Sequence, residues 1–409
     1  MALNPMTLKL TEFDLSPHCG FLPDPDPLIH LPHPHIFSPL EEMANNLPKL
    51  LAAGILRNEI MRFSSEMLYP MRAQHASSTI FEYTRNNNAL MRRIKVIFDY
   101  LGQAYVWGEN PPAQTIPAGF AGFWYHISQQ ATLPPILSYS SYVLYNWRRI
   151  DPQKPIVLGN LAVVQNFLGG LDEDWFILIH VDIENRAGII PAAIIGALQA
   201  LTHRDIVMLE TYLAMITLSL ESMLKTLERM PERCDEYIYY TRVRPYLHGW
   251  KNNPSIPDGI MYEGVSAYRN KPQQFRGESG AQSSIIPSLV AFLDIRHKET
   301  TFTPYLQEML SYMPNGHRRL IEAIEQLSCN GYSLFNFVRA RKQDNPSLYD
   351  AYRSCRNALY NFRKKHFEYV GRYIHSQAQR HTGNPTAIGT AGTPFMTSLK
   401  ELMDETWFE

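Results

Sequence analysis

The sequence predicts an all-α protein in which a small N-terminal helical domain (residues 1–115) packs on a large C-terminal helical domain (residues 116–409). Apolar residues recur at helical spacing along most of the chain, and the sustained two-residue alternation of half-buried strands is almost absent. The stretch ENPPAQTIPAG at 109–119 carries the prolines expected of a joint between domains. A chain of 409 residues also exceeds the usual size of one compact domain.

Residues 14–40 are rich in proline and histidine. Proline fixes φ and removes a backbone donor, so this segment is predicted to be an extended arm lying on the surface. The alternative interpretation is a metal site formed by His30, His33 and His35. The arm is the better interpretation, because X-Pro geometry splays neighbouring side chains and no fourth ligand is nearby.

Helical patterns follow from residue 40 to about residue 101 and again beyond the joint. The clearest is 205–230, where apolar residues at 206, 209, 213, 216 and 220 match a 3.6-residue period. We find no internal repeat. Helices beyond the joint are expected near 140–147, 159–168, 191–200, 204–229, 235–246, 282–296, 303–312, 317–328 and 347–378.

Composition excludes several classes of protein. The net charge of −1 argues against a broad nucleic-acid interface, which needs an excess of Lys and Arg. The four cysteines, Cys19, Cys234, Cys329 and Cys355, form no CxxC or CxxCH, so a zinc ribbon, a redox dithiol and covalently attached c-type haem are unsupported.

The location of the protein is predicted from what the sequence lacks. Its start has no basic stretch followed by an apolar run, as a signal peptide has. The most apolar windows, 175–183 and 206–220, are interrupted by charged or polar residues and fall short of a membrane span. Lone thiols fit a reducing compartment. We therefore expect a soluble cytoplasmic protein without a membrane partner. The sequence leaves the oligomeric state open, and a monomer is favoured over an oligomer.

The most informative helix is 348–375, whose apolar stripe runs from Leu348 through Leu359 and Phe362 to Ile374. His366 falls on this stripe. An imidazole on an apolar face needs a partner, and a hydrogen-bonded core histidine is the commoner case. The alternative is a haem iron held by one neutral imidazole, with the opposite coordination position left open. Arg363, one turn earlier, could pair with a haem propionate or with a carboxylate behind the ligand.

Two loops of small residues could approach a ligand closely. In FRGESGAQSS (275–284), Gly277 and Gly280 permit close backbone contact, and Ser279 supplies a hydroxyl. The loop matches neither a Walker motif nor a dinucleotide fingerprint, and a simple turn before a helix is an equal alternative. GTAGTPF (389–395) is a second loop of this kind, for which a turn is the simpler explanation.

Two further segments place polar groups among apolar ones. His180 lies inside WFILIHVDIE (175–184), either as a hydrogen-bonded core histidine or facing a pocket. RVRPYLHGWKNNP (242–254) offers Arg242 and Arg244 beside aromatic residues. Guanidinium groups grip carboxylates through two hydrogen bonds, although solvated surface charge is the commoner role of arginine.

Together, these segments resemble the indoleamine 2,3-dioxygenase family, in order along residues 40–400. The resemblance is carried by AYVWG (104–108), LPPILSYSSYVLYNW (133–147), VRPYLHGWKNNP (243–254), DGIMYEG (258–264), FRGESGAQSS, YMPNGHRRLIEAIE (312–325), the His366 helix and GTAGTPF. It implies an all-α haem enzyme that cleaves the indole C2–C3 bond of L-tryptophan, or of a related indoleamine, with O2 to give N-formylkynurenine. The cofactor implied is non-covalent haem b in the large domain.

The resemblance also implies roles for single residues. His366 resembles the proximal iron ligand, Arg363 the arginine one turn before it, and Arg244 the residue that binds the substrate carboxylate. Ser279 and Gly280 match the loop over the haem, and Thr390 matches a threonine that contacts the amino-acid group of the substrate. The pocket around haem and indole would be lined by Tyr139, Val143, Phe176, Tyr239 and Leu247.

Three positions depart from the family pattern. His180 stands where the mammalian enzymes have a serine and resembles the distal histidine of tryptophan 2,3-dioxygenases, which meets the indole N–H. Glu278 replaces a glycine, and Tyr239 replaces a phenylalanine. Two alternatives therefore stay open: a haem enzyme that rearranges a modified tryptophan, as pyrrolnitrin-type relatives do, and a haem sensor without turnover.

Overall fold

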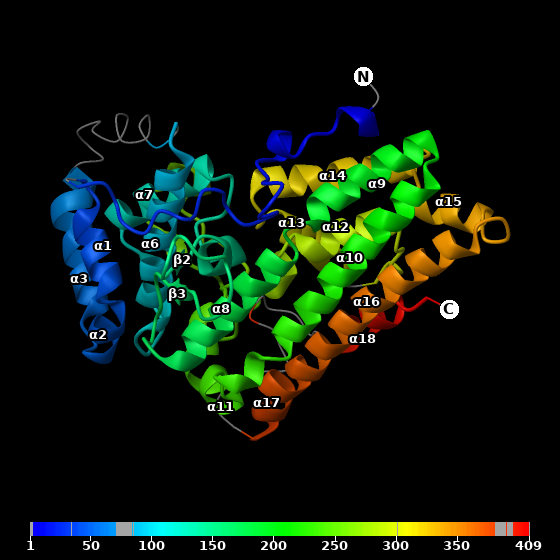
Figure 1. Ribbon diagram of the computed structural model, residues 1–409. Coiled ribbons are helices and arrows are strands. Elements are labelled where there is room, and N and C mark those ends of the chain that lie inside the picture. The colour runs from blue at the N-terminus through cyan, green and yellow to red at the C-terminus, as the bar shows by residue number, and fades with distance from the viewer. Residues whose placement is uncertain are drawn as a thin grey trace.

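The computed structural model describes residues 3–33, 35–70, 84, 86–300, 302–380, 390 and 396–408. These residues are mostly helical, as predicted (Figure 1). The helices are α1 (Ser38–Asn45), α2 (Leu47–Ala52), α3 (Leu56–Phe63), α6 (Asn88–Trp107), α7 (Ala118–Gln130), α8 (Leu171–Arg186), α9 (Ile190–His203), α10 (Ile206–Leu227), α11 (Glu236–Ile238), α12 (Ile285–Phe292), α13 (Thr303–Leu310), α14 (Asn315–Cys329), α15 (Leu334–Ala340), α16 (Pro346–Val370), α17 (Ser376–Arg380) and α18 (Met396–Asp404).

The N-terminal arm is extended but does not simply lie on the surface. Its apolar side chains, including Phe21, Leu31 and Phe37, are buried, so the prediction of a surface arm is wrong in this respect. Burial of these side chains anchors a proline-rich segment that has few backbone hydrogen bonds of its own. Figure 1 shows the arm, in blue, running from the α14 side of the molecule to α1.

Helix α6 is the centre of the smaller group of helices, which α1, α3 and α7 cover. The Asn87 side chain caps α6 by accepting a hydrogen bond from the Leu90 backbone N–H, 3.0 Å away. Within α6, the Lys95 ammonium lies 2.6 Å from the Asp99 carboxylate, and both side chains are fully buried. Trp124 of α7 also donates to Asp99 over 2.6 Å, which satisfies the buried charge and fixes α7 against α6.

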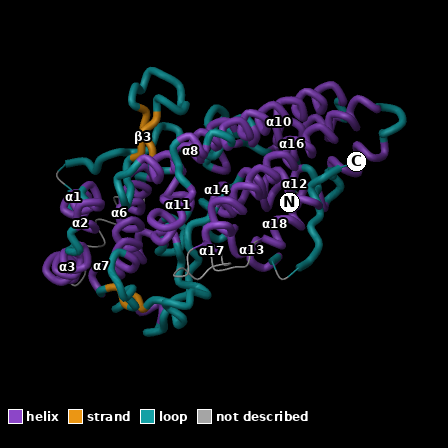
Figure 2. Tube along the Cα trace, turned by 90° about the horizontal axis from the view of Figure 1, so that it is seen from below, coloured by secondary structure: helices purple, strands orange, loops and turns teal. Residues whose placement is uncertain are grey.

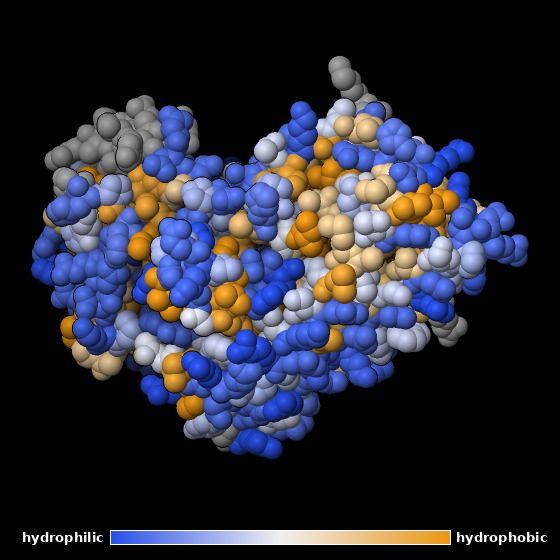
Figure 3. Space-filling view, viewed as in Figure 1, coloured by the Kyte–Doolittle hydropathy of each residue, from blue (hydrophilic) through white to orange (hydrophobic). Residues whose placement is uncertain are grey.

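The larger group is built around the long helices α10 and α16, which run side by side in both views (Figures 1 and 2). Helices α8 and α9 pack on α10, and α18 packs on α16. The stretch Ile206–Glu232 is long and apolar enough to cross a membrane. It is also a helix of this packed core, although Val207 and Leu218 are exposed on the outer face, where apolar surface is visible in Figure 3.

The described residues contain four short strands in two pairs. β1 (Thr115–Ile116) pairs in parallel with β4 (Met261–Tyr262), and β2 (Trp147–Arg149) pairs antiparallel with β3 (Leu161–Val163). The helix predicted over 159–168 is therefore wrong. A three-residue strand is too short to produce visible alternation, so its apolar residues resembled part of a helical pattern.

Other predicted helices differ from the structure in kind or extent. Residues 140–147 form a π-helical turn, Ser140–Leu144, that leads into β2. Residues 235–246 contain α11, a π-turn at Tyr239–Val243 and a 3-10 turn at Arg244–Leu247. Helix α8 was not predicted, because its middle section is apolar on nearly every side and lacks a clear period.

Candidate functional site

Helix α16 presents its apolar stripe to two different environments. Leu348, Tyr352, Cys355 and Leu359 are fully buried against the core. From Phe362 onward, the same stripe is only partly buried. The stripe is therefore fully packed in the first part of the helix and more accessible in the second.

His366 lies in this second part of α16, and its side chain is accessible. Nevertheless, burial within the protein lowers its pKa to about 4, and His180 and Arg363 lower it further by charge repulsion. The ring is thus accessible at its surface, while protein atoms surround it closely enough to disfavour its charged form. At neutral pH the imidazole is uncharged, which is the form that binds metal.

Arg363, one turn before His366, holds α18 against α16. Its NH1 donates to the backbone oxygen of Leu402 over 2.8 Å and to the Thr406 hydroxyl. Burial lowers its pKa to about 10, and the nearby Glu405 opposes this effect. Of the two roles predicted for Arg363, an interaction with a carboxylate behind His366 has Glu405 as its candidate partner. Contact of Arg363 with a haem propionate stays a prediction.

His180 lies on α8, close enough to His366 to affect its pKa. Its Nδ1 is 2.7 Å from the backbone oxygen of Phe176, so Nδ1 carries the proton and Nε2 is left as a hydrogen-bond acceptor. The ring packs on Phe176 with centroids 4.5 Å apart, and burial lowers its pKa. The effect of His180 on the pKa of His366 indicates that the two imidazoles share one interior environment.

A buried carboxyl fixes the wall beside His180. Glu184, one turn later on α8, accepts hydrogen bonds from the Tyr139 hydroxyl at 2.9 Å and from the Ser283 hydroxyl at 2.7 Å. Tyr139 in turn meets the His180 ring edge-on at 6.2 Å. Glu184 therefore joins α8, the segment before β2 and the loop 275–284, which lie far apart in the sequence.

Aromatic rings form a continuous wall around this region. Phe176 stacks on Tyr239 at 4.6 Å and contacts Tyr142 at 6.3 Å. Val143 and Leu247, two other predicted lining positions, are fully buried in the core beside it. The structure thus brings Tyr139, Phe176 and Tyr239 together around His180.

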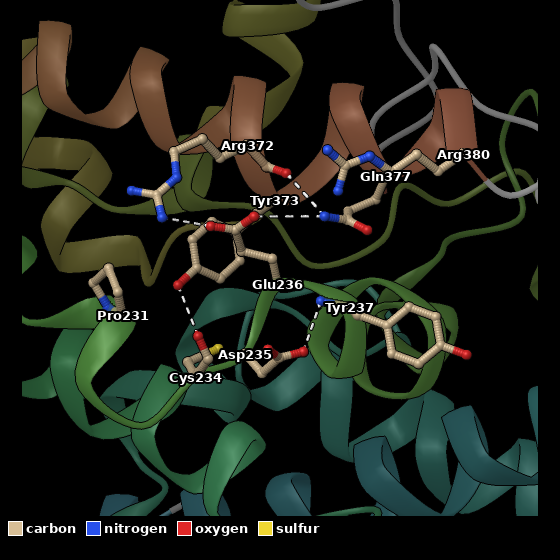
Figure 4. A pocket seen from close by; sticks show the side chains of 9 residues that line it. All are labelled: Pro231, Cys234, Asp235, Glu236, Tyr237, Arg372, Tyr373, Gln377 and Arg380. Atoms are coloured by element: carbon tan, nitrogen blue, oxygen red, sulfur yellow. Dashed lines mark hydrogen bonds and ion pairs between the residues drawn. The ribbon is translucent and has the colours of Figure 1, made fainter.

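A pocket of about 480 Å³ lies between residues 231–237 and the segment that follows α16 (Figure 4). Tyr373 separates it from the aromatic wall. The Tyr373 hydroxyl donates to the Cys234 backbone oxygen over 2.7 Å, and its ring meets Tyr239 edge-on at 5.9 Å. Arg372 closes the other side through an ion pair with Glu236 at 2.5 Å.

Arg244 is a fully buried cation at the edge of the aromatic wall. Its NH1 lies 3.2 Å from Nε2 of His248, and its guanidinium packs over the Tyr240 ring at 5.4 Å. Burial lowers the pKa of Arg244, and burial with repulsion from Arg244 lowers that of His248 well below its usual value. His248 therefore stays neutral and accepts a hydrogen bond from the guanidinium, which orients Arg244.

The loop 275–284 is held tightly against the chain that follows Arg244. A Cβ on Gly277 would lie 2.2 Å from the Leu247 backbone oxygen, so only glycine fits there. A Cβ on Gly280 would meet nothing within 4 Å, which places open space beside the loop. Ser279 Oγ accepts a hydrogen bond from the Ala281 N–H at 3.3 Å and lies 3.4 Å from the Tyr305 hydroxyl.

Thr390 connects this loop to the C-terminal part of the chain. Its hydroxyl donates to the backbone oxygen of Glu278 at 2.6 Å, and its own carbonyl accepts from the Gly249 N–H at 3.0 Å. The rest of GTAGTPF lies outside the described residues. Thr390 therefore lies beside both the loop 275–284 and the segment that carries Arg244.

Glu184 and His248 were not singled out from the sequence. Glu184 lies one helical turn from His180 in an otherwise apolar stretch. Because a buried carboxylate needs hydrogen-bond donors, this position could have been recognised as a candidate. The signal for His248 was its spacing of four residues from Arg244. In neither case does the sequence reveal the partner that gives the residue its role.

The side chains present fit a haem. No group of three or more His, Cys, Asp or Glu side chains that could hold a metal ion occurs among the residues the structure describes. The accessible, neutral imidazole of His366, the open space at Gly280 and the aromatic wall suit a flat, apolar group that carries an iron.

A helical protein that presents one neutral, accessible imidazole near a second histidine has features of a haem protein. Comparison with known proteins identifies the family. The family model for indoleamine 2,3-dioxygenase matches residues 9–408, so the chain belongs to this family of haem-dependent oxidoreductases.

Three relatives illustrate the similarity, which extends over nearly the whole length of both chains. Human indoleamine 2,3-dioxygenase 2 is 33% identical, covering 98% of this chain and 95% of its own. Rat indoleamine 2,3-dioxygenase 1 is 32% identical over 97% and 94%. Indoleamine 2,3-dioxygenase nanC of Aspergillus nanangensis is 30% identical over 99% and 98%.

We predict that replacing Glu278 with Gln weakens the pH dependence of stability. Burial raises the pKa of Glu278 to about 8 from its usual 4.5, so between these values the folded protein keeps a proton that the unfolded chain has released. This contribution makes the free energy of unfolding fall as pH rises, by up to about 1.4 kcal/mol per pH unit.

Urea unfolding of wild type and Glu278→Gln at pH 5, 6, 7 and 8 measures the effect. Histidines with lowered pKa values act in the opposite direction below about pH 6.5, but they are common to both proteins and cancel in the difference. The variant should gain stability relative to wild type as pH rises. Parallel curves would show that Glu278 does not titrate in this range.

Proposed function

We propose that this chain is a haem b-dependent dioxygenase that cleaves the C2–C3 bond of L-tryptophan, or a related indoleamine, with O2 to give N-formylkynurenine. The observation that carries the proposal is the neutral, accessible imidazole of His366, which His180 is close enough to affect. His366 would hold the iron. The haem, when bound, supplies the binding and activation of O2.

Arg244 is proposed to bind the substrate carboxylate. Its guanidinium is already desolvated and oriented by His248, so little reorganisation is needed when a carboxylate arrives. A carboxylate would also compensate a buried positive charge. Thr390 lies beside this position and is proposed to contact the amino-acid group of the substrate.

His180 is proposed to accept a hydrogen bond from the indole N–H. Because its Nδ1 donates to the Phe176 carbonyl, Nε2 presents a lone pair toward the pocket. This bond would orient the indole ring while Phe176 and Tyr239 pack against its apolar surface. Ser279 and Gly280 are proposed to cover the haem, since the backbone at Gly280 borders open space.

We predict that His366→Ala abolishes stable haem binding without unfolding the protein. The imidazole is accessible and makes no structural hydrogen bond within the described residues, so its loss affects mainly the ligand to iron. An absorption spectrum of the purified, haem-reconstituted protein measures the Soret band, and circular dichroism measures helicity. His203→Ala, at an exposed site ending α9, is the control. Full haem retention by His366→Ala would contradict the assignment.

We predict that Arg244→Ala raises KM for L-tryptophan by roughly 10- to 100-fold while haem content is unchanged, because charged hydrogen bonds contribute about 1.5–3 kcal/mol. Steady-state assays of N-formylkynurenine absorbance give KM and kcat. Arg242→Ala removes an exposed arginine two residues away and should leave KM unaltered. Equal effects of the two substitutions would refute a specific role for Arg244.

We predict that His180→Ala narrows the preference for L-tryptophan over its N1-methyl derivative by about tenfold, the value of one hydrogen bond of about 1.4 kcal/mol. The N-methyl compound cannot donate to Nε2, so only tryptophan loses an interaction. The ratio of kcat/KM for the two substrates is the measurement, with His180→Gln as a variant that keeps an acceptor. An unchanged ratio in His180→Ala would leave the residue with a packing role.

A further inference from the structure

The peptide unit between His248 and Gly249 is held from both of its sides. Its oxygen accepts one hydrogen bond from the Gln103 side-chain amide at 2.6 Å and another from the Trp107 indole N–H at 2.8 Å. Its N–H donates to the backbone oxygen of Thr390 at 3.0 Å. Because a peptide unit is planar, bonds to its oxygen and to its N–H together restrict its rotation.

Gln103 and Trp107 come from consecutive turns of α6, the central helix of the smaller group. Residues four apart lie on one face of a helix, so both donors reach the same oxygen. The helix that carries them is itself fixed, because Asp99, one turn earlier, is held by Lys95 and Trp124. The two donors therefore have a rigid support.

The amide of Gln103 contributes little to stability. The residue is fully buried, and its Nε2 makes the bond to the His248 oxygen. Its Oε1 has no hydrogen-bond partner among the described residues. Leaving a buried acceptor unpaired costs about as much free energy as a hydrogen bond contributes. The effect of this side chain is therefore on the position of the peptide that it bonds.

The same peptide contacts both groups proposed to bind the amino-acid end of the substrate. The ring of His248 accepts a hydrogen bond from Arg244 at 3.2 Å, and the Gly249 N–H bonds Thr390. The backbone around it is closely packed, since a Cβ on Gly249 would lie 2.1 Å from the Gly277 nitrogen. A rotation of this peptide would therefore displace Arg244 and Thr390 together.

We propose that Gln103 and Trp107 are positioning residues for Arg244, acting through His248. The smaller group of helices then does more than cover the larger one, because α6 sets the geometry in which Arg244 meets a carboxylate. In this role neither side chain touches the substrate. Loss of either donor weakens binding of the amino-acid end and leaves binding of the indole ring unchanged. This inference rests on the proposed function, since it requires that Arg244 binds the substrate.

The test uses Gln103→Met and Trp107→Phe, which each remove one donor and keep most of the side-chain volume. Binding is read without turnover, from the change in the Soret band of the haem-loaded protein. Each variant should bind L-tryptophan about 3- to 10-fold more weakly than wild type, the range expected for one neutral hydrogen bond. Each should bind 3-methylindole, which lacks the amino-acid end, as wild type does.

Asn185→Leu is the matched control. It removes another amide bond of 2.6 Å to a backbone oxygen, that of Ile156 on the outer side of α8, and should bind both compounds like wild type. Circular dichroism and haem content verify that every variant is folded.

A double-mutant cycle shows whether the effect passes through Arg244. In an Arg244→Ala background, Gln103→Met and Trp107→Phe should cause no further loss of tryptophan affinity. The same loss in both backgrounds, or an equal loss for 3-methylindole, overturns the inference. So does a protein with both substitutions that binds tryptophan like wild type. These results leave the proposed function intact as long as Arg244→Ala itself weakens tryptophan binding; if it does not, the proposed role of Arg244 fails as well.

Discussion

The site depends on one constraint: His366 must be enclosed by the protein without being covered by it. Enclosure keeps the imidazole neutral, with a pKa of about 4, and accessibility leaves its lone pair available. Helix α16 meets both requirements by changing its surroundings along its length. Its first half is packed into the core up to Leu359, and its second half is more accessible. A histidine one or two turns earlier would be packed into the core.

The segments that carry His180 and Arg244 are positioned by contacts between parts of the chain that are distant in sequence. Glu184 joins α8 to Tyr139 and Ser283, and Thr390 joins the loop 275–284 to the segment after Arg244. The close approach of Gly277 to Leu247 leaves no room for a side chain, so the loop cannot shift without breaking these bonds. The groups proposed to contact the substrate are therefore fixed before it binds, which reduces the entropy lost on binding.

The helical class and the main helices could be predicted from the sequence, because α10, α14 and α16 each bury one stripe against the core. Where that asymmetry is missing, prediction failed: α8 is apolar on nearly every side, and β3 is three residues long. The resemblance of several segments to the family gave the candidate residues. The structure places four of them together, namely Tyr139, Phe176, His180 and Tyr239. The hydrogen bonds of Glu184 and His248 were not predictable, since single-sequence patterns carry no information about partners brought together only by folding.

The buried acids of the described residues differ in whether other groups pair with them. Asp99 meets Lys95 and Trp124, and Glu173 meets two backbone N–H groups, so each of these carboxyls holds other segments in place. Glu278 is 4% exposed, yet no described residue pairs with its carboxyl. Burial raises its pKa to about 8, so the group is mostly protonated at neutral pH and no bare charge is buried. The fold therefore tolerates this carboxyl by keeping it neutral, whereas it tolerates Asp99 by surrounding it with donors.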